Sequence, residues 1–162
     1  PGAFNPLHEG HRRMAAVAAE VTGHEVTFEL SVANVDKPSL DFVEVARRVA
    51  QFDQHHCLVT RAPTFVDKAT LMPGATFVVG LDTLIRIADE AYYDDSPAVR
   101  DDALSHIAGA GCRFLVFGRT FDDEFLTLDD LELPPALAAI CTGVSEEVFR
   151  EDISSTELRE AE

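Results

Sequence analysis

Apolar runs and helical patterns alternate along most of the chain. Residues 26–32 are rich in β-branched and aromatic residues between Gly23 and Asn34, which predicts a strand. Shorter apolar runs at 58–60, 76–79 and 114–117 predict three more strands. Continuous apolar runs of this kind are typical of parallel strands that are covered on both faces.

Helical spacing marks the segments between these runs. The pattern predicts helices over residues 9–21, 42–52, 83–91 and 98–108, and Gly23 is the expected C-cap of the first. The expected buried stripes are Phe42, Val45, Val49 and Phe52; then Leu84, Ile87 and Ala91; then Leu104, Ile107 and Ala108. Strands that alternate with helices in this way predict an α/β fold with a parallel sheet.

Composition narrows the class of protein. The 162 residues are 46% hydrophobic and 26% charged, which excludes a disordered tail and a disulfide miniprotein. No apolar run approaches the roughly 20 residues that span a bilayer, and residues 1–4 do not resemble a signal peptide. We therefore expect one domain over residues 1–162 with no membrane partner.

Charge is distributed unevenly between the two halves. The net charge is −16, with 7 basic and 9 acidic residues in 1–81 and 6 basic and 20 acidic residues in 82–162. An acidic chain repels the phosphate backbone, so a general nucleic-acid binder is excluded. Cys57, Cys112 and Cys141 form no C-x-x-C pair, which predicts reduced thiols, a cytoplasmic location and no zinc site.

The first chemical motif is the segment from Gly2 to His11, which reads Gly-Ala-Phe-Asn-Pro-Leu-His-Glu-Gly-His. It predicts a glycine-containing turn that enters a helix, with His8 and His11 on one face of the first helical turn. The N-terminus of a helix attracts phosphate, and two imidazoles add hydrogen-bond donors. Two surface histidines or a metal site are the alternatives, although a third metal ligand at useful spacing is missing.

The second motif lies near the end of the chain, where residues 153–159 read Ile-Ser-Ser-Thr-Glu-Leu-Arg. Ser154 or Ser155 would cap a helix, and the hydroxyl and free N–H groups would make a second anion site. An ordinary capping box is the alternative interpretation.

Together the two motifs resemble the paired signatures of the nucleotidylyltransferase superfamily, and the resemblance spans nearly the whole chain. It is closest to a cytidylyltransferase-like branch, through Asp36-Lys37-Pro38, Gly80-Leu81-Asp82-Thr83 and residues 152–159. The resemblance implies a Rossmann-like, doubly wound parallel sheet with helices on both faces. It also implies that the sequence is a piece of a longer chain that lacks its first strand.

The implied activity is transfer of a nucleoside monophosphate group from ATP or CTP to a phosphorylated acceptor, with release of pyrophosphate. A pyridine mononucleotide is the expected acceptor, and Mg²⁺ is expected to arrive on the nucleotide phosphates. The alternatives are a cytidylyltransferase for another phosphorylated acceptor and a regulatory nucleotide-binding domain. The chain has no Trp, the residue on which pyridine-mononucleotide enzymes of this group typically stack the ring; a Phe or Tyr92 could replace it.

The resemblance also implies a role for each candidate residue. The catalytic set is His8, His11 and Lys37. The nucleotide- and phosphate-binding set is Gly2, Phe4, Asn5, Ser154, Ser155, Thr156 and Arg159. The acceptor or base would contact Gly80, Asp82 and Thr83. Lys37 could instead be a surface lysine, Asp82 a helix N-cap, and Arg48, a recurrent arginine of the group, the partner of a nearby carboxylate.

Overall fold

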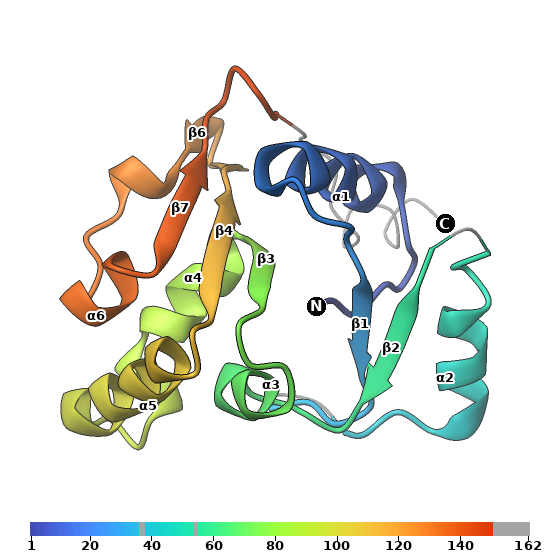
Figure 1. The fold of residues 1–162 in the computed structure, drawn as a ribbon, viewed down its shortest axis with the longest axis horizontal. Coiled ribbons are helices and arrows are strands. Elements are labelled where there is room, and N and C mark those ends of the chain that lie inside the picture. The colour runs from blue at the N-terminus through green and yellow to red at the C-terminus, as the bar shows by residue number, and fades with distance from the viewer. Residues whose placement is uncertain (36–37, 54, 151–162) are drawn as a thin grey trace. The chain divides into compact units, whose positions relative to one another are not determined.

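A computed structural model describes residues 1–35, 38–53 and 55–150 (Figure 1). The chain divides into two compact units, and the boundary between them lies between Thr64 and Phe65. Each unit has its own hydrophobic core and parallel strands, so each is described by itself.

The first unit pairs two parallel strands and carries two helices. Its elements in chain order are α1 (Glu9–Thr22), β1 (Phe28–Ser31), α2 (Phe42–Val49) and β2 (Cys57–Thr60). The register of the strands runs from Phe28 opposite Cys57 to Ser31 opposite Thr60. Helix α1 ends at Gly23, whose φ of 69° is the left-handed conformation that glycine adopts without strain. The predicted C-cap is confirmed.

The core of the first unit is a cluster of apolar side chains around β1. Its buried members are Phe4, Leu7, Phe28, Leu30 and Phe52. Val45 and Val49 of α2 pack against this cluster, as the helical pattern predicts. The N-terminal turn therefore belongs to the core, because two of the five buried residues come from it.

Two burial predictions in this unit are wrong. Leu58 and Val59 are each 47% exposed, because β2 pairs with β1 on one side and no described strand pairs with its other edge. Phe42 is 94% exposed because it is the first residue of α2, one turn ahead of the part that meets the cluster. The helix ends at Val49, so Phe52 reaches the core from beyond it.

The second unit is built on a parallel sheet in the order β3-β4-β7 (Figure 1). Its helical elements are α3 (Phe65–Leu71), α4 (Leu81–Ala88), the 3₁₀ helix η1 (Glu90–Tyr92), α5 (Pro97–Gly109), the 3₁₀ helix η2 (Leu128–Asp130) and α6 (Pro135–Ala138). Its strands are β3 (Thr76–Gly80), β4 (Arg113–Phe117), β5 (Arg119–Phe121), β6 (Glu124–Leu126) and β7 (Cys141–Val144). Strands β5 and β6 form an antiparallel hairpin.

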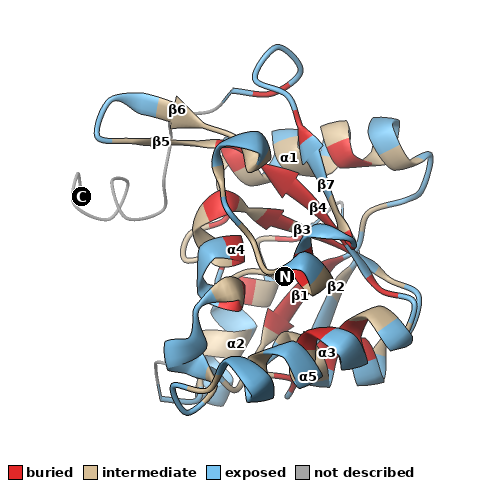
Figure 2. Ribbon diagram, turned by 90° about the vertical axis from the view of Figure 1, so that its left-hand side faces the viewer, coloured by how far each residue is buried: buried red, intermediate tan, exposed pale blue. Residues whose placement is uncertain are grey.

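Strand β4 is the centre of the second unit's core. Residues 114–117 are all buried, as their continuous apolar run predicts, and β4 has a neighbouring strand on each side (Figure 2). Leu84 and Ile87 of α4 and Leu104 and Ile107 of α5 complete this core. Parallel strands that alternate with helices confirm the predicted Rossmann-like α/β class.

The pattern misplaces some boundaries in the second unit. Helix α4 runs over Leu81–Ala88, so the predicted span of 83–91 is wrong at both ends and Ala91 is exposed in η1. Strands β5, β6 and β7 were not predicted, because their short segments mix polar and apolar residues. No helix in the described part of the chain is long and apolar enough to cross a membrane. Cys57, Cys112 and Cys141 are free thiols.

Candidate functional site

The turn that precedes α1 is anchored on β1 and on aromatic side chains. The Gly2 N–H donates to the Glu29 carbonyl at 3.0 Å. The Phe4 ring is buried and packs edge-on against Phe28 and Phe52, with centroids 5.4 and 5.1 Å away. A Cβ at residue 2 would lie 2.7 Å from the Phe4 ring, so this position requires glycine. The Phe4 side chain is therefore part of the core and is not available to a ligand.

His8 and His11 meet at the start of α1, as their spacing predicts. His8 is the N-cap, and its N–H donates to Nδ1 of His11 at 3.2 Å. The two ring centroids lie 3.8 Å apart, and Phe4 packs edge-on against the His11 ring at 5.2 Å. The first turn of a 14-residue helix thus brings two imidazoles to a helix N-terminus with its partial positive charge.

The surroundings of His11 keep its ring uncharged. Burial, followed by the nearby His8, lowers the pKa of His11 from 6.5 to about 4. Because Nδ1 accepts the His8 N–H, the single proton of the neutral ring resides on Nε2. His11 therefore offers an N–H donor without a full charge at the helix N-terminus.

Helix α2 holds the same turn from the other side. Arg48 donates to the Ala3 carbonyl at 2.8 Å and pairs with Glu44 at 2.7 Å. Arg47 donates to the Asn5 side-chain oxygen. Hydrogen bonds from Arg47 and Arg48 lower the pKa of Glu44 to about 2. The prediction that Arg48 pairs with a carboxylate is confirmed, and the bond to Ala3 is additional.

A second group of candidate residues lies in the second unit, where β3 meets α4. Gly80 is the N-cap of α4, so the alternative prediction of Asp82 as a helix N-cap is wrong, because the helix begins at Leu81. Asp82 and Thr83 follow in the first helical turn. Asp82 pairs with Arg119 of β5 at 3.4 Å, and both side chains are about 40% exposed. The sheet register places Gly80 opposite Phe117, two residues before Arg119.

Two residues of these groups escaped the sequence analysis. Arg119 follows the predicted strand 114–117 closely, and a basic residue just after a strand was the available signal. Gln51, just beyond the end of α2, contacts the turn, and nothing in its local sequence indicates this. The remaining candidate residues, Lys37, Ser154, Ser155, Thr156 and Arg159, lie outside the described residues.

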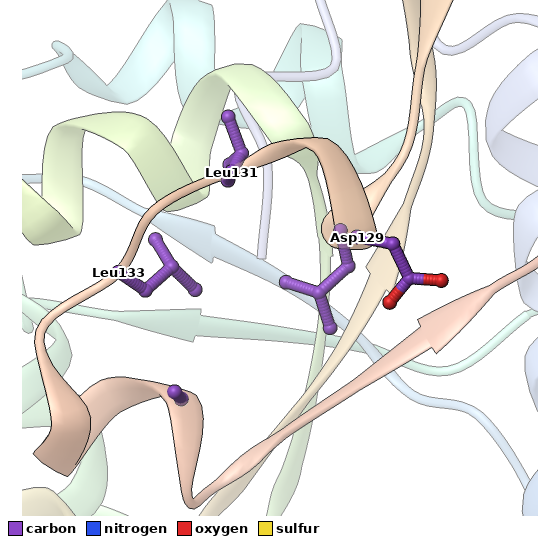
Figure 3. A pocket seen from close by; sticks show the side chains of 5 residues that line it. Asp129, Leu131 and Leu133 are labelled. Carbon is purple, nitrogen blue, oxygen red and sulfur yellow. The ribbon is translucent and has the colours of Figure 1, made fainter.

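A cavity of about 310 Å³ lies elsewhere in the second unit (Figure 3). It is lined by Leu128, Asp129, Leu131, Leu133 and Ala138. One carboxylate among apolar side chains does not provide the convergent polar groups of a phosphate or nucleotide site. None of the candidate site residues in the described part of the chain lines it.

The fold and the motif at the start of α1 define an α/β protein of the Rossmann-like nucleotidylyltransferase class. A family described as cytidylyltransferase-like matches residues 1–161, so the chain belongs to this family. The suspected superfamily is confirmed, and nucleotidyl transfer is supported as the general class of activity. A search of the curated proteins found no match, and neither did a search of the solved structures.

Proposed function

We propose that the protein transfers a nucleoside monophosphate group from a nucleoside triphosphate to a phosphorylated small molecule. The observation that carries this proposal is the pair of imidazoles at the N-terminus of α1, with His11 kept neutral. Donors at a helix N-terminus suit the triphosphate, and membership of the cytidylyltransferase-like family supports the same class of ligand.

The reaction needs no enzyme nucleophile. An oxygen of the acceptor phosphate attacks the α-phosphorus of the triphosphate, the bond from that phosphorus to the bridging oxygen breaks, and pyrophosphate leaves. Catalysis then consists of positioning and of stabilising the charge that develops on the phosphoryl oxygens. His8 and His11 would contribute this stabilisation at the α1 N-terminus.

Residues outside the described part of the chain complete the proposal. Lys37 would neutralise a phosphate, and the Ser154, Ser155 and Thr156 hydroxyls would hold the β- and γ-phosphates together with Arg159. Gly2 and Asn5 would border the nucleotide through the turn that also holds Phe4. These roles come from the resemblance of the sequence motifs.

Magnesium enters this proposal as part of the substrate. In the described residues no cluster of three or more His, Cys, Asp and Glu side chains could hold a metal ion. Mg²⁺ binds through phosphate oxygens and a few carboxylates, and it keeps much of its water. We therefore propose that it is carried by the triphosphate.

For the acceptor we propose a pyridine mononucleotide that contacts Gly80, Asp82 and Thr83. The Asp82 carboxylate can accept hydrogen bonds from ribose hydroxyls or the base, and Arg119 beside it supplies a cation for a phosphate. Tyr92, 43% exposed in η1 after α4, is a candidate for stacking on the ring. The free thiols support a reducing compartment, for which we propose the cytoplasm.

A second candidate is a CTP-dependent transferase that acts on a different phosphorylated acceptor. The description of the family as cytidylyltransferase-like favours this alternative. The two candidates share the triphosphate chemistry and differ in the base and the acceptor.

The test is pyrophosphate release from ATP and from CTP with Mg²⁺, across a panel of phosphorylated acceptors that includes nicotinamide and nicotinate mononucleotide. The proposal expects turnover with one triphosphate and one acceptor, and a strong loss in His11→Ala. His24→Gln is the matched control, because His24 is exposed just beyond the end of α1. Failure of the folded protein to bind any nucleoside triphosphate at millimolar concentration would refute the proposal.

A further inference from the structure

Gln51, just beyond the end of α2, forms hydrogen bonds to the turn that precedes α1 through both Nε2 and Oε1 of its side-chain amide. Its Nε2 donates to the Phe4 carbonyl at 2.9 Å, and its Oε1 accepts the Leu7 N–H at 2.8 Å. The same Nε2 also donates to the Arg48 carbonyl at 3.0 Å, within its own segment. One planar group thus ties the main chain of the turn at two points to the end of α2.

These two points enclose the part of the turn that leads into the histidines. Phe4 precedes the Asn5–Pro6 peptide, and Leu7 immediately precedes His8. Because an amide is rigid and planar, its two hydrogen bonds fix the spacing between the Phe4 carbonyl and the Leu7 N–H. The direction in which the chain enters α1 at His8 is set by this spacing.

Neighbouring side chains of α2 also hold the main chain of this turn. Arg48 binds the Ala3 carbonyl and is itself held by Glu44, one helical turn earlier. Arg48 is 9% exposed, so this bond is shielded from water. The main chain of residues 3, 4 and 7 is therefore fixed by the side chains of Arg48 in α2 and of Gln51 just beyond it.

We propose that Gln51 is a positioning residue for phosphate binding, which sets the placement of His8 and His11 through the turn. The inference rests on the proposed function for its kinetic consequence, but the placement itself can be measured without turnover. A displacement of about 1 Å at a reacting group can cost roughly 100-fold in rate, so a small movement of the turn is sufficient.

The test compares two Gln51 variants with a matched control. Gln51→Met keeps the length of the side chain and removes both hydrogen bonds. Gln51→Glu keeps an acceptor for the Leu7 N–H and loses the donor to the Phe4 carbonyl. Val45→Ala is the control, because Val45 packs on the same core from α2 and takes no part in the hydrogen bonds to the turn.

The first measurement is the titration of the histidine rings by nuclear magnetic resonance, which does not need activity. In the parent protein the pKa of His11 lies far below the ordinary 6.5. Gln51→Met is expected to raise the pKa of His11 toward 6.5, because a looser turn exposes the ring and weakens the bond from the His8 N–H. Val45→Ala is expected to leave the titration of His11 unchanged.

The second measurement is steady-state kinetics in both substrates. The expected result is a fall in kcat/KM for the triphosphate of roughly 10- to 100-fold in Gln51→Met, with the KM of the acceptor unchanged. Gln51→Glu is expected to lose activity as well, because it loses the Nε2 donor to the Phe4 and Arg48 carbonyls. It also provides the second variant if Gln51→Met does not fold.

The outcomes separate the two proposals. If the parent protein binds no triphosphate, the proposed function fails, and the histidine titration still decides whether Gln51 places the turn. If the parent is active and both Gln51 variants match Val45→Ala in titration and kinetics, Gln51 is a structural residue and this inference is overturned.

Discussion

At the scale of single residues, the protonation state of His11 decides which hydrogen bonds the N-terminus of α1 can make. A protonated His11 would lose the acceptor at Nδ1 that receives the His8 N–H, and the turn would lose one of its hydrogen bonds. The neutral ring instead keeps this bond and presents Nε2–H as a donor. Burial therefore keeps the imidazole neutral, and the hydrogen bond from the His8 N–H fixes its tautomer.

This state makes a prediction for stability against pH. The pKa of His11 is about 4 in the folded chain and 6.5 as its ordinary value, so the unfolded chain binds more protons between these limits. The contribution to the free energy of unfolding is fully present above pH 6.5 and is lost as the pH falls toward 4. Chemical denaturation over this range should show that the free energy of unfolding of the parent falls relative to that of His11→Gln as the pH falls. A constant difference between the two would contradict the prediction.

Substitutions of the two histidines should lower kcat to different extents. His11 lies one turn into α1 and presents an N–H donor, so His11→Ala should lower kcat more than His8→Gln does. Loss of one donor to developing charge typically costs about 100- to 1,000-fold in rate. Steady-state pyrophosphate release measures this, with His24→Gln as control. A His11→Ala rate equal to that of the parent would remove His11 from the mechanism.

The meeting of His8 and His11 was predictable from the sequence because three-residue spacing on a helix is local geometry. The positions of Gln51 and Arg119 were not. Gln51 lies 44 residues from Leu7 along the chain, and only the packing of α2 on the first core brings them together. A long-range hydrogen bond leaves no periodic pattern in the sequence.

At the scale of elements, the strands with the strongest apolar runs were located well. The run at 114–117 lies within β4, whose side chains are buried and contribute Phe114 and Val116 to the core formed with α4 and α5. The run at 58–60 forms β2, but at an edge the same apolar character does not ensure burial. Hydrophobicity therefore predicts that a strand exists, whereas its neighbours decide which side chains are covered.

A substitution at the junction of β3 and α4 tests whether Asp82 contacts the acceptor. In Gly80→Ala the new Cβ would lie 2.8 Å from Oδ1 of Asp82, so that side chain must move, and its pairing with Arg119 must change. The backbone of Gly80, with φ of −81°, is allowed for alanine. The KM of the acceptor should rise while that of the triphosphate stays the same, and the poorer N-cap should cost about 1 kcal/mol of stability.

Gly109→Ala is the matched control for this experiment. A Cβ at residue 109 meets nothing within 4 Å, at the end of α5. Equal acceptor KM values in the two variants would show that Asp82 does not contact the acceptor.

At the scale of the whole molecule, the net charge of −16 works against a free triphosphate. Repulsion between the acidic chain and the triphosphate favours binding of the magnesium complex, which carries less negative charge than the free triphosphate. Binding of an anion by such a chain must then depend on local donors, such as the neutral His11 imidazole and the helix N-terminus.

Binding of that complex should stabilise the folded chain. A ligand at 100 times its Kd contributes about 2.7 kcal/mol to the free energy of unfolding. For a chain of this size each kcal/mol raises the Tm by roughly 2–4 °C, so a rise of about 5–10 °C is expected. Differential scanning calorimetry with Mg²⁺ and ATP or CTP measures it, and the corresponding monophosphates serve as controls. An unchanged Tm at saturating triphosphate would argue against a nucleotide site.

The hydrogen bonds from Arg48 and Gln51 to the turn before α1 have a consequence for how that turn tolerates mutation. Arg48 and Gln51 bind the carbonyl groups of residues 3 and 4, which every amino acid supplies, and the N–H of residue 7, which every amino acid except proline supplies. In a saturation mutagenesis library, tolerance at Ala3 and Leu7 should be limited mainly by packing, while Gln51 should admit few replacements. An engineer could therefore vary the side chains of the turn, where packing allows, without redesigning the shape of the loop.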